Sequence, residues 1–513
     1  MTNRSLFSQF PRAQIVCGLL IAFATVGLTA CHSDNFLQYK FPQFTFANRP
    51  VPPSLLANRV MIGVTNGGST GSLQIVDAKR DIRNNVENTK PSFSISGYAS
   101  GFPNLILNFP AEVTGYVYSN AKGDVQIINY GKESVSGAAS GLPTGVQSTG
   151  LAIPPTFGHI YSAAESIGQL TVADNTTGKS YGLILPNVFQ VVVNQGDTIA
   201  LAMVRNSNTI YRVVKLNANQ FQTSTAAIVT TGAADCEPFN LPVYCAVPVN
   251  TGSHANAFDR PMGAYFSLDG TAVYVLNCGQ ECGGSTSSVT YLQPGVLQYN
   301  NIPTSVPDAS AFETQVLVPG GVTAAVANGT TLYISGQQLQ PDGLFAGNLS
   351  TISLATNTVT GQYSISDGNH SKMLFADNNT LWIGSQFCAT GERASRAAKQ
   401  IAAGQATDQT ANFNCLTRFD MGALTASIVP AVSQSSTAPV AVPFPNTNQN
   451  QFYYGDLTGL CWVQSFNKVY TAYGGQVHIF STVDGSEISN VNVIVQGTAL
   501  DVAYLDAVTD ADN

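Results

Sequence analysis

Charged residues are scarce in this chain of 513 residues. Asp, Glu, Lys and Arg make up 10% of it, against about 25% in an average soluble protein. Only 22 residues are basic and the net charge is −8, so the chain lacks the clustered basic surface that phosphate binding requires. Nucleic acid is therefore excluded as a partner. Apolar residues still make up 44%, so the composition of a disordered chain is also absent and a large core can form.

Strong helix formers are scarce as well. Gly, Asn, Ser, Thr and Val fill the places that Glu, Lys, Arg and Leu occupy in helical proteins, and the 46 Gly and 25 Pro residues follow no collagen period. Residues of this kind favour short strands joined by turns. The composition therefore predicts an all-β protein.

Motifs for catalysis and cofactor binding are missing from the sequence. Gly-x-Ser-x-Gly, a P-loop, a dinucleotide fingerprint and the Cys-x-x-Cys-His motif of covalent haem do not occur. Residues 267–270 resemble the sialidase Asp-box only loosely, because Gly follows Asp269 directly, so a hairpin turn is expected there. The histidines are scattered and each is expected on the surface or in a turn: His32, His159, His254, His370 and His478. We predict no cofactor, no metal ligand and no catalytic residue from these patterns.

The amino end has the features of an export signal. Arg4 and Arg12 give it a positive start, and residues 13–30 form an apolar to weakly polar run that stops abruptly at Cys31. The sequence Leu-Thr-Ala-Cys over 28–31 resembles the lipobox of bacterial lipoproteins. An ordinary signal peptide and an uncleaved anchor helix are the alternatives, since the run is at the short limit for spanning a bilayer.

The lipobox resemblance implies a lipid anchor at Cys31. In that family the cysteine receives a diacylglycerol, the chain is cut before it, and the new amino terminus is acylated. Three acyl chains would hold the protein on a membrane essentially permanently, since each buried methylene contributes about 0.8 kcal/mol. Residue 32 is His and not the Asp that retains proteobacterial lipoproteins at the inner membrane. The resemblance therefore implies the bacterial cell envelope, with the outer membrane favoured, and a membrane as the partner of this end of the chain.

Residues 31–57 are expected to form a membrane tether, because they contain four prolines and no clear strand pattern. Their five aromatic residues are too many for a free linker, so part of the tether is expected to pack along the next domain. The expected organisation is a signal peptide over 1–30, the tether over 31–57, one repeat domain over 58–507 and a tail over 508–513.

From Asn58 onward one unit of four short strands recurs. Its first turn carries Gly, Asn or Asp, which tolerate the positive φ of a tight hairpin, as at 195–197, 268–270, 328–329, 377–379 and 465–467. The innermost strands are predicted to start near residues 103, 149, 188, 262, 322, 371 and 457. With insertions allowed, this spacing fits the roughly 40–50 residues of a four-stranded propeller blade. The count predicts a β-propeller of eight blades, or seven if one unit is misread.

One end of the repeat domain lacks a strand, and the other end has a strand without a partner. The first unit, over 59–77, lacks an inner strand, and residues 499–506 form a strand with no partner after it. Pairing these two segments would close the ring and remove an exposed sheet edge. We therefore predict that the carboxyl-terminal strand completes the first blade.

The repeated units resemble the YVTN-type β-propeller repeat. In that family an Asp-Gly turn leads into Val-Tyr-Val-Ala-Asn, then a Val-x-Val-Ile-Asp strand and a Thr-Gly turn. The sequence Leu-Asp-Gly-Thr-Ala-Val-Tyr-Val-Leu-Asn over 268–277 matches best, and 72–77 and 467–485 match more weakly. The resemblance implies a propeller that serves as a binding or display scaffold.

Six of the seven cysteines after the lipobox form close pairs along the chain, and disulfide bonds persist in exported proteins. The expected bonds are Cys236–Cys245, Cys278–Cys282 and Cys388–Cys415. The alternative, a zinc site, would need four ligands, and no second cysteine pair at ligand spacing lies near Cys278. Cys461 lies in the apolar run 460–463 and is expected to be a buried free thiol.

One stretch, 391–403, has a helical pattern, with Arg393, Arg396 and Lys399 near helical spacing. It lies between Cys388 and Cys415, so a surface helix that caps an insertion is expected. A docking element for an acidic partner is the alternative.

Three functions are compatible with these features. The favoured one is a binding or scaffold module on the cell envelope that holds a glycan, peptide or protein through loops at the blade edges. The second is a propeller enzyme, lactonase-like or glycan-cleaving, which would need carboxylates and His or Asn converging on the axis, often around a divalent metal. The third is a structural envelope protein without a small ligand. The groups that lie at the axis discriminate among them.

Overall fold

The computed structural model describes residues 49–67, 70–82, 93–217, 220, 236, 243–303, 308–388, 391–405, 414–430, 454–488 and 493–508. The predicted signal peptide, Cys31, His32 and most of the tether lie outside these residues. Within them, no helix is both long and apolar enough to cross a membrane.

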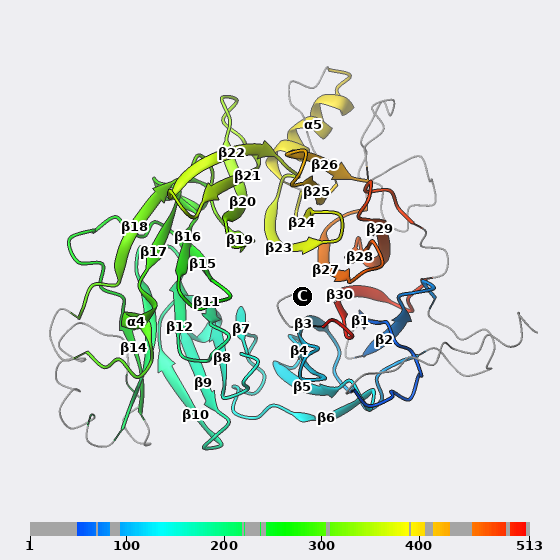
Figure 1. Ribbon diagram of the computed structural model, residues 1–513, viewed down its shortest axis with the longest axis horizontal. Helices are drawn as coiled ribbons and strands as arrows, with labels where there is room; N and C mark the ends of the chain where they lie inside the picture. The colour runs from blue at the N-terminus through cyan, green and yellow to red at the C-terminus, as the bar shows by residue number, and fades with distance from the viewer. Residues whose placement is uncertain are drawn as a thin grey trace, which may run out of the picture.

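Eight antiparallel sheets surround a central axis, which is the arrangement of a β-propeller (Figure 1). We number the blades in chain order, starting with the blade that contains β1. Blade 2 has β3 (Pro103–Phe109), β4 (Thr114–Ser119), β5 (Asp124–Asn129) and β6 (Ser134–Ala138); blade 3 has β7 (Gly150–Ala152), β8 (His159–Ala164), β9 (Gln169–Asp174) and β10 (Lys179–Ile184). Blade 4 has β11 (Val188–Val193), β12 (Ala200–Val204), β13 (Ile210–Leu216) and β14 (Val243–Pro248); blade 5 has β15 (Pro261–Phe266), β16 (Val273–Asn277), β17 (Ser288–Leu292) and β18 (Phe312–Leu317).

The second half of the ring follows the same plan. Blade 6 has β19 (Ala324–Ala327), β20 (Thr331–Leu339), β21 (Phe345–Ser353) and β22 (Thr358–Ser364); blade 7 has β23 (Asn369–Ala376), β24 (Thr380–Gln386), β25 (Leu416–Asp420) and β26 (Thr425–Val429). Blade 8 has β27 (Leu457–Val463), β28 (Lys468–Tyr473) and β29 (Gln476–Ser481); blade 1 has β1 (Arg59–Thr65), β2 (Gly71–Asp77) and β30 (Thr498–Tyr504). The helical segments are short: η1 (Glu165–Ile167), η2 (Gly279–Cys282), α4 (Pro294–Leu297) and α5 (Glu392–Ala402).

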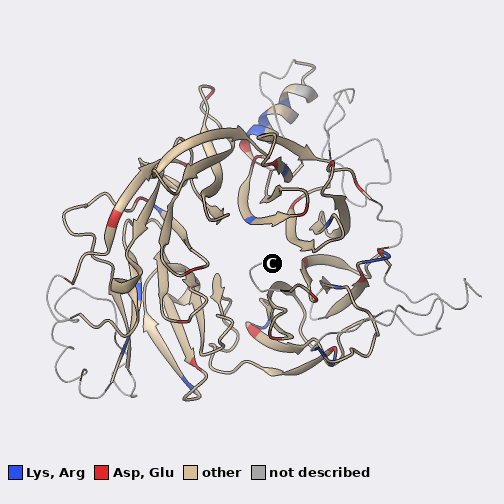
Figure 2. Cartoon of the chain, viewed as in Figure 1, with Lys and Arg blue, Asp and Glu red and all other residues tan. Residues whose placement is uncertain are grey.

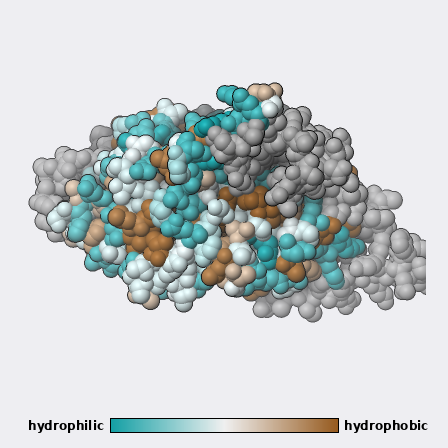
Figure 3. Space-filling view, turned by 90° about the horizontal axis from the view of Figure 1, so that it is seen from above, coloured by the Kyte–Doolittle hydropathy of each residue, from teal (hydrophilic) through white to brown (hydrophobic). Residues whose placement is uncertain are grey.

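The core lies between the blades, because each sheet packs both of its faces against a neighbour. All seven residues of β1 are buried, including alternate residues that would face solvent in a one-sided sheet. Outer strands show the other pattern: in β22 the exposed residues are Thr and Ser with one Gln, and the residues between them are half-buried. The rim of the molecule accordingly shows hydrophobic side chains in separate patches among polar ones (Figure 3). This difference explains why the second strands of the blades, such as β1, read as continuous apolar runs and the outermost strands alternate.

The carboxyl-terminal strand closes the ring, as the sequence predicts. β30 is the inner strand of blade 1 and pairs antiparallel with β1, with Val60 opposite Tyr504. The fourth strand of blade 1 is reduced to residues 93–96, which bond to β2 through Phe93 and Ile95. In blade 8 a single bridge, between Phe480 and Glu487, takes the same place. The eight blades therefore include six with four regular strands and two whose outermost strand is minimal.

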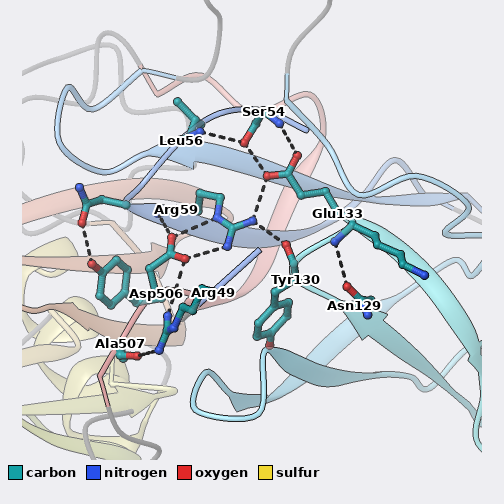
Figure 4. Close-up of polar contacts among 12 residues, drawn as sticks. Arg49, Ser54, Leu56, Arg59, Asn129, Tyr130, Glu133, Asp506 and Ala507 are labelled. Atoms are coloured by element: carbon teal, nitrogen blue, oxygen red, sulfur yellow. Dashed lines mark hydrogen bonds and ion pairs between the residues drawn. The ribbon is translucent and has the colours of Figure 1, made fainter. Parts of the chain in front are cut away.

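Charged residues fasten the closing strand at the carboxyl end of β30 (Figure 4). The buried guanidinium of Arg59 donates to Asp506 through Nη2 at 2.7 Å and through Nε at 3.0 Å. It also bonds to Glu133 Oε1 at 3.0 Å and to the Tyr130 carbonyl at 2.7 Å, both in blade 2. Ser54, in the segment that precedes β1, donates to both oxygens of Glu133, through its backbone N to Oε2 and through its hydroxyl to Oε1. This Arg59 clasp joins blade 1, blade 2 and the end of the predicted tether, which packs along the domain as expected.

The predicted unit boundaries agree closely with the observed blades. The seven predicted inner strands start within two residues of β3, β7, β11, β15, β19, β23 and β27. The first turns contain residues with positive φ, as predicted: Asp197, Gly270, Gly329, Asn378 and Asn467. The stretch 267–270 is a hairpin turn, closed by a bond from Gly270 N to the Ser267 carbonyl.

Candidate functional site

The propeller has two faces, which we name by the direction of the inner strands. Lys372, Asp501 and Ile106 are each the fourth residue of their inner strand, and their groups meet, so these strands run the same way. We call the face on which inner strands begin the start face and the opposite one the end face. The β16–β17, β20–β21 and β24–β25 connections lie on the start face, and Arg59 and Asp506 lie on the end face.

The axis of the propeller is almost without charge (Figure 2). Among the residues of the eight inner strands, only Lys372 of β23 and Asp501 of β30 carry a charged side chain, apart from His370. Lys372 Nζ lies 3.2 Å from Asp501 Oδ1, and the backbone N of Ile106 donates to Asp501 Oδ2 at 2.8 Å. Burial raises the pKa of Asp501 although Lys372 and the backbone donors oppose this effect. These partners use the carboxylate internally, so it joins blades 7, 1 and 2 and is not presented to a substrate.

Glycine makes this axial ion pair possible. The pair spans the inner strand of blade 8, where a Cβ on Gly459 would lie 2.8 Å from Asp501 Oδ1. Any other residue there would displace the carboxylate that Lys372 reaches.

The expectation that each histidine lies on the surface or in a turn is wrong for three of the four described. His159, His370 and His478 are buried, and His254 is exposed. Each buried ring has a polar partner outside its own strand, for example Asp197 for His159 and Glu487 for His478. The ring of His370 bonds to the Ser366 carbonyl, and burial lowers the pKa of His370 to about 4. The partners lie between 4 residues away, for His370, and 85 residues away, for His159, and none lies in the same strand as its histidine, so strand periodicity could not reveal them.

The start face carries insertions on three consecutive blades. Blade 5 contributes η2 within the Cys278–Cys282 loop, blade 6 the extended β20–β21 hairpin, and blade 7 the segment that contains α5. Arg393 of α5 bonds to both oxygens of Asp342 in the hairpin, at 3.0 and 3.2 Å. Glu281 of η2 accepts a bond of 2.9 Å from the backbone N of Gln337 in β20. The three insertions therefore form one continuous wall, which we call the blade 5–7 wall.

Helix α5 confirms the predicted helical stretch within its insertion. Arg393, Ala394 and Ala397 are buried, and Arg396 and Lys399 are exposed. Because Arg393 pairs with Asp342 inside the wall, it cannot also dock an acidic partner. The helix mainly supports the insertion, as the favoured interpretation of the sequence states.

Glu281 is a residue that sequence reasoning missed. Burial raises its pKa to about 7, and the bond from Gln337 N opposes this effect only in part. Its carboxylate lies directly on the backbone of Gly321, where a Cβ would approach Oε2 to 2.3 Å. The consecutive glycines at 320 and 321 were the available sequence signal, since they mark a close approach of the backbone to another group.

The blade 5–7 wall presents apolar side chains to solvent. Phe387, directly after β24, is 56% exposed and has a φ of 60°, in the left-handed region that an aromatic residue rarely adopts. Asp456 Oδ1 accepts a bond of 2.7 Å from Phe387 N, and Gly391 N donates to the Phe387 carbonyl at 2.9 Å. Leu339, at the end of β20, is 45% exposed. A residue held in a costly conformation with its ring in solvent is typical of a functional surface.

The structure contains the three disulfide bonds that local spacing predicts: Cys236–Cys245, Cys278–Cys282 and Cys388–Cys415. Two of them lie in the blade 5–7 wall. Cys461 is free and buried, and burial raises the pKa of its thiol, which disfavours the nucleophilic thiolate. In the described part of the chain, no group of three or more His, Cys, Asp or Glu side chains is placed to hold a metal ion.

Comparisons with known proteins add evidence on the fold. No protein-family model matches the chain, and no curated protein matches it. Among solved structures, dihydro-heme d1 dehydrogenase NirN in complex with DHE is 11% identical, with a TM-score of 0.50 over 89% of this chain and 79% of that one. Hydrazine synthase of Kuenenia stuttgartiensis is 12% identical, with a TM-score of 0.43 over 78% and 99%, and the Myceliophteria thermophila Cps50 (Swd1) β-propeller domain is 9% identical, with 0.41 over 74% and 96%. At 11% identity the likeness to the first of these structures concerns the fold alone.

Proposed function

We propose that this protein is a lipid-anchored envelope protein whose propeller binds a glycan, peptide or protein partner through the blade 5–7 wall. The observation that carries this proposal is the exposed, left-handed Phe387 within a wall fixed by Arg393–Asp342 and by two disulfide bonds. A rigid surface loses little conformational entropy on binding, which favours affinity. Aromatic residues are enriched among the side chains that dominate binding interfaces.

The anchoring part of the proposal rests on the lipobox at 28–31 and on the position of Arg49. Arg49 bonds to the Ala507 carbonyl and lies 3.9 Å from Asp506, so the last part of the tether joins the propeller on the end face. An anchor attached at this face would leave the blade 5–7 wall on the side away from the bilayer. This orientation suits a protein that presents a binding surface from the outer membrane.

No observation favours the enzymatic alternative. The charged pair on the described inner strands, Lys372 and Asp501, is used to join blades. Propeller enzymes of the kind considered from the sequence would need several unsatisfied carboxylates near one point of the axis.

The anchor is tested by labelling cells with palmitate. Wild-type protein should incorporate the label and sediment with membranes, and Cys31→Ala should lose both properties. A Cys31→Ala protein that stays in the membrane fraction would show that residues 13–30 form an uncleaved anchor helix.

The binding face is tested by photo-crosslinking in intact cells. A photoreactive amino acid at Phe387 should give one discrete adduct, and the same group at Thr360, on the exposed edge of β22, should give none. Phe387→Ala with the crosslinker at Leu339 should weaken the adduct. Equal labelling from Thr360, or no adduct from any position of the wall, would refute this binding face.

A further inference from the structure

A buried polar cluster joins blades 3 and 4 on the end face. His159, the first residue of β8, lies between two partners from blade 4: its Nδ1 is 2.7 Å from Asp197 Oδ2, and its Nε2 is 2.7 Å from the hydroxyl oxygen of Tyr244. The side chains of all three are almost fully buried. Both ring nitrogens are therefore engaged at hydrogen-bond distance, away from solvent.

A second layer of contacts completes the cluster. The Tyr244 hydroxyl donates to Asp174 Oδ2 at 2.7 Å, and Lys215 Nζ donates to the same oxygen at 3.1 Å. The Tyr161 hydroxyl donates to Asp197 Oδ1 at 3.1 Å. Lys215 also lies over the rings of Tyr244 and Tyr299, at 5.2 and 6.0 Å from the ring centres. The titratable groups that face His159 are thus two carboxylates, one ammonium group and three tyrosines.

The protons of this cluster can be counted. Three short contacts form one chain, from Asp197 through His159 and Tyr244 to Asp174, and each contact requires one hydrogen. Ionised carboxylates supply none, a tyrosine hydroxyl supplies one, and a neutral imidazole supplies one. A neutral His159 therefore leaves one contact without a hydrogen.

The missing hydrogen falls between His159 and Asp197. Burial alone would raise the pKa of Asp174, but its bonds from Tyr244 and Lys215 lower it to about 2, so Asp174 is ionised. Burial and the neighbouring Asp174 raise the pKa of Tyr244, so this hydroxyl keeps its proton and directs it to Asp174. The oxygen of Tyr244 must then accept from Nε2–H of His159. With Nε2 protonated, Nδ1 also needs a hydrogen to lie 2.7 Å from the Asp197 carboxylate.

We propose that His159 is held as the doubly protonated imidazolium, and that this bound proton locks the junction between blades 3 and 4. The charges balance, since Asp174 and Asp197 are opposed by His159 and Lys215. Loss of the proton would place the Nδ1 lone pair against a buried carboxylate, and such a buried unpaired acceptor is costly. The lock therefore weakens as the pH rises. The inference does not depend on the proposed function.

The direction of the pH dependence follows from the linkage between proton binding and folding. On this proposal the folded cluster keeps a proton that an unfolded histidine loses as the pH rises, so the folded state binds one more proton on the alkaline side. The unfolding equilibrium constant should rise by up to about tenfold per pH unit while this difference lasts. For a protein whose surroundings follow the external medium, this junction would respond directly to alkaline conditions.

The direct test is nuclear magnetic resonance of the full chain with nitrogen-15 in its five histidines, the His159 signals being assigned by their loss in His159→Gln. At pH 7.5 both ring nitrogens of His159 should carry a hydrogen. If one ring nitrogen lacks a hydrogen at this pH, the proposal is wrong.

The second test uses Tyr244→Phe, which removes the acceptor that Nε2–H requires and leaves His159 and Asp197 in place. Between pH 7.5 and 9 the unfolding equilibrium constant of the wild type should rise more steeply than that of Tyr244→Phe. Tyr291→Phe is the matched control, because the buried Tyr291 hydroxyl makes no hydrogen bond to any residue that the structure describes, and its slope should equal that of the wild type. Equal slopes for wild type and Tyr244→Phe would overturn the proposal, since a purely structural role would lower stability by the same factor at every pH.

Discussion

Replacing Asp506 by alanine should destabilise the closed ring, because this side chain holds the closing strand through Arg59. The carboxylate accepts from Nη2 and Nε of Arg59 and from its backbone N, at 2.7, 3.0 and 2.7 Å. Arg59 is only 3% exposed, so water cannot replace the lost partner. Glu133 and the Tyr130 carbonyl would remain as its acceptors.

The size of the effect follows from the burial of this ion pair. Removing one partner of a buried, hydrogen-bonded pair costs about 3–5 kcal/mol. A folded unit of about 450 residues has an unfolding entropy near 0.9 kcal/mol per kelvin, at roughly 2 cal/mol per kelvin per residue. The melting temperature should therefore fall by about 3–5 °C.

Scanning calorimetry of the purified protein measures this shift. Glu313→Ala is the control, because it removes an exposed carboxylate from β18 and should change the melting temperature by less than about 1 °C. A shift for Asp506→Ala no larger than that of Glu313→Ala would refute the role assigned to the Arg59 clasp.

Three further predictions concern closure and pH. Truncation after Gly497 removes β30, so it should abolish the single cooperative melting transition and cause aggregation, measured by calorimetry and light scattering; a truncated chain that melts like the parent would contradict the closure. The pKa of Glu281 is raised by burial to about 7, so its contribution to stability is present at low pH and is lost as the pH rises from about 4.5 to 7; Glu281→Gln should gain up to about 3 kcal/mol relative to wild type between pH 4.5 and 8 in denaturant titrations, and a constant difference would exclude this burial. The pKa of His370 is lowered by burial to about 4, so its contribution is present above about pH 6.5 and is lost as the pH falls toward 4; His370→Gln, which can still donate to the Ser366 carbonyl, should show a smaller acid loss than wild type, by up to about 3 kcal/mol, and an unchanged acid limb would refute it.

The sequence predicts the blades well because each blade is built from local signals. Alternating apolar residues mark the strands, and turn residues that tolerate positive φ, such as Gly270 and Asn467, mark where they reverse. The pairing of β30 with β1 is distant in sequence, yet it was predictable because each segment lacked a partner nearby. The cysteine pairs were predictable for the same local reason.

The candidate site was less visible in the sequence. Arg393 and Asp342 lie in different blades, as do Glu281 and Gln337, and only the packing of neighbouring blades brings each pair together. The buried histidines were missed because burial between blades depends on which strands become neighbours. Local patterns thus predict the units, whereas contacts between units determine the site.

The position of β30 has a consequence for the order in which this protein can fold. Arg59 and Asp506 are 447 residues apart, so β1 is made first and its inner neighbour last. During synthesis, the inner edge of β1 stays unpaired until β30 has been made, and such an unpaired edge can bind another chain. Contacts of this sequence separation also form slowly, since a long loop must close before they form. The ring can therefore close, and the exposed sheet edge disappear, only after β30 has been made. A chain that lacks β30 would remain open even if its other blades had formed.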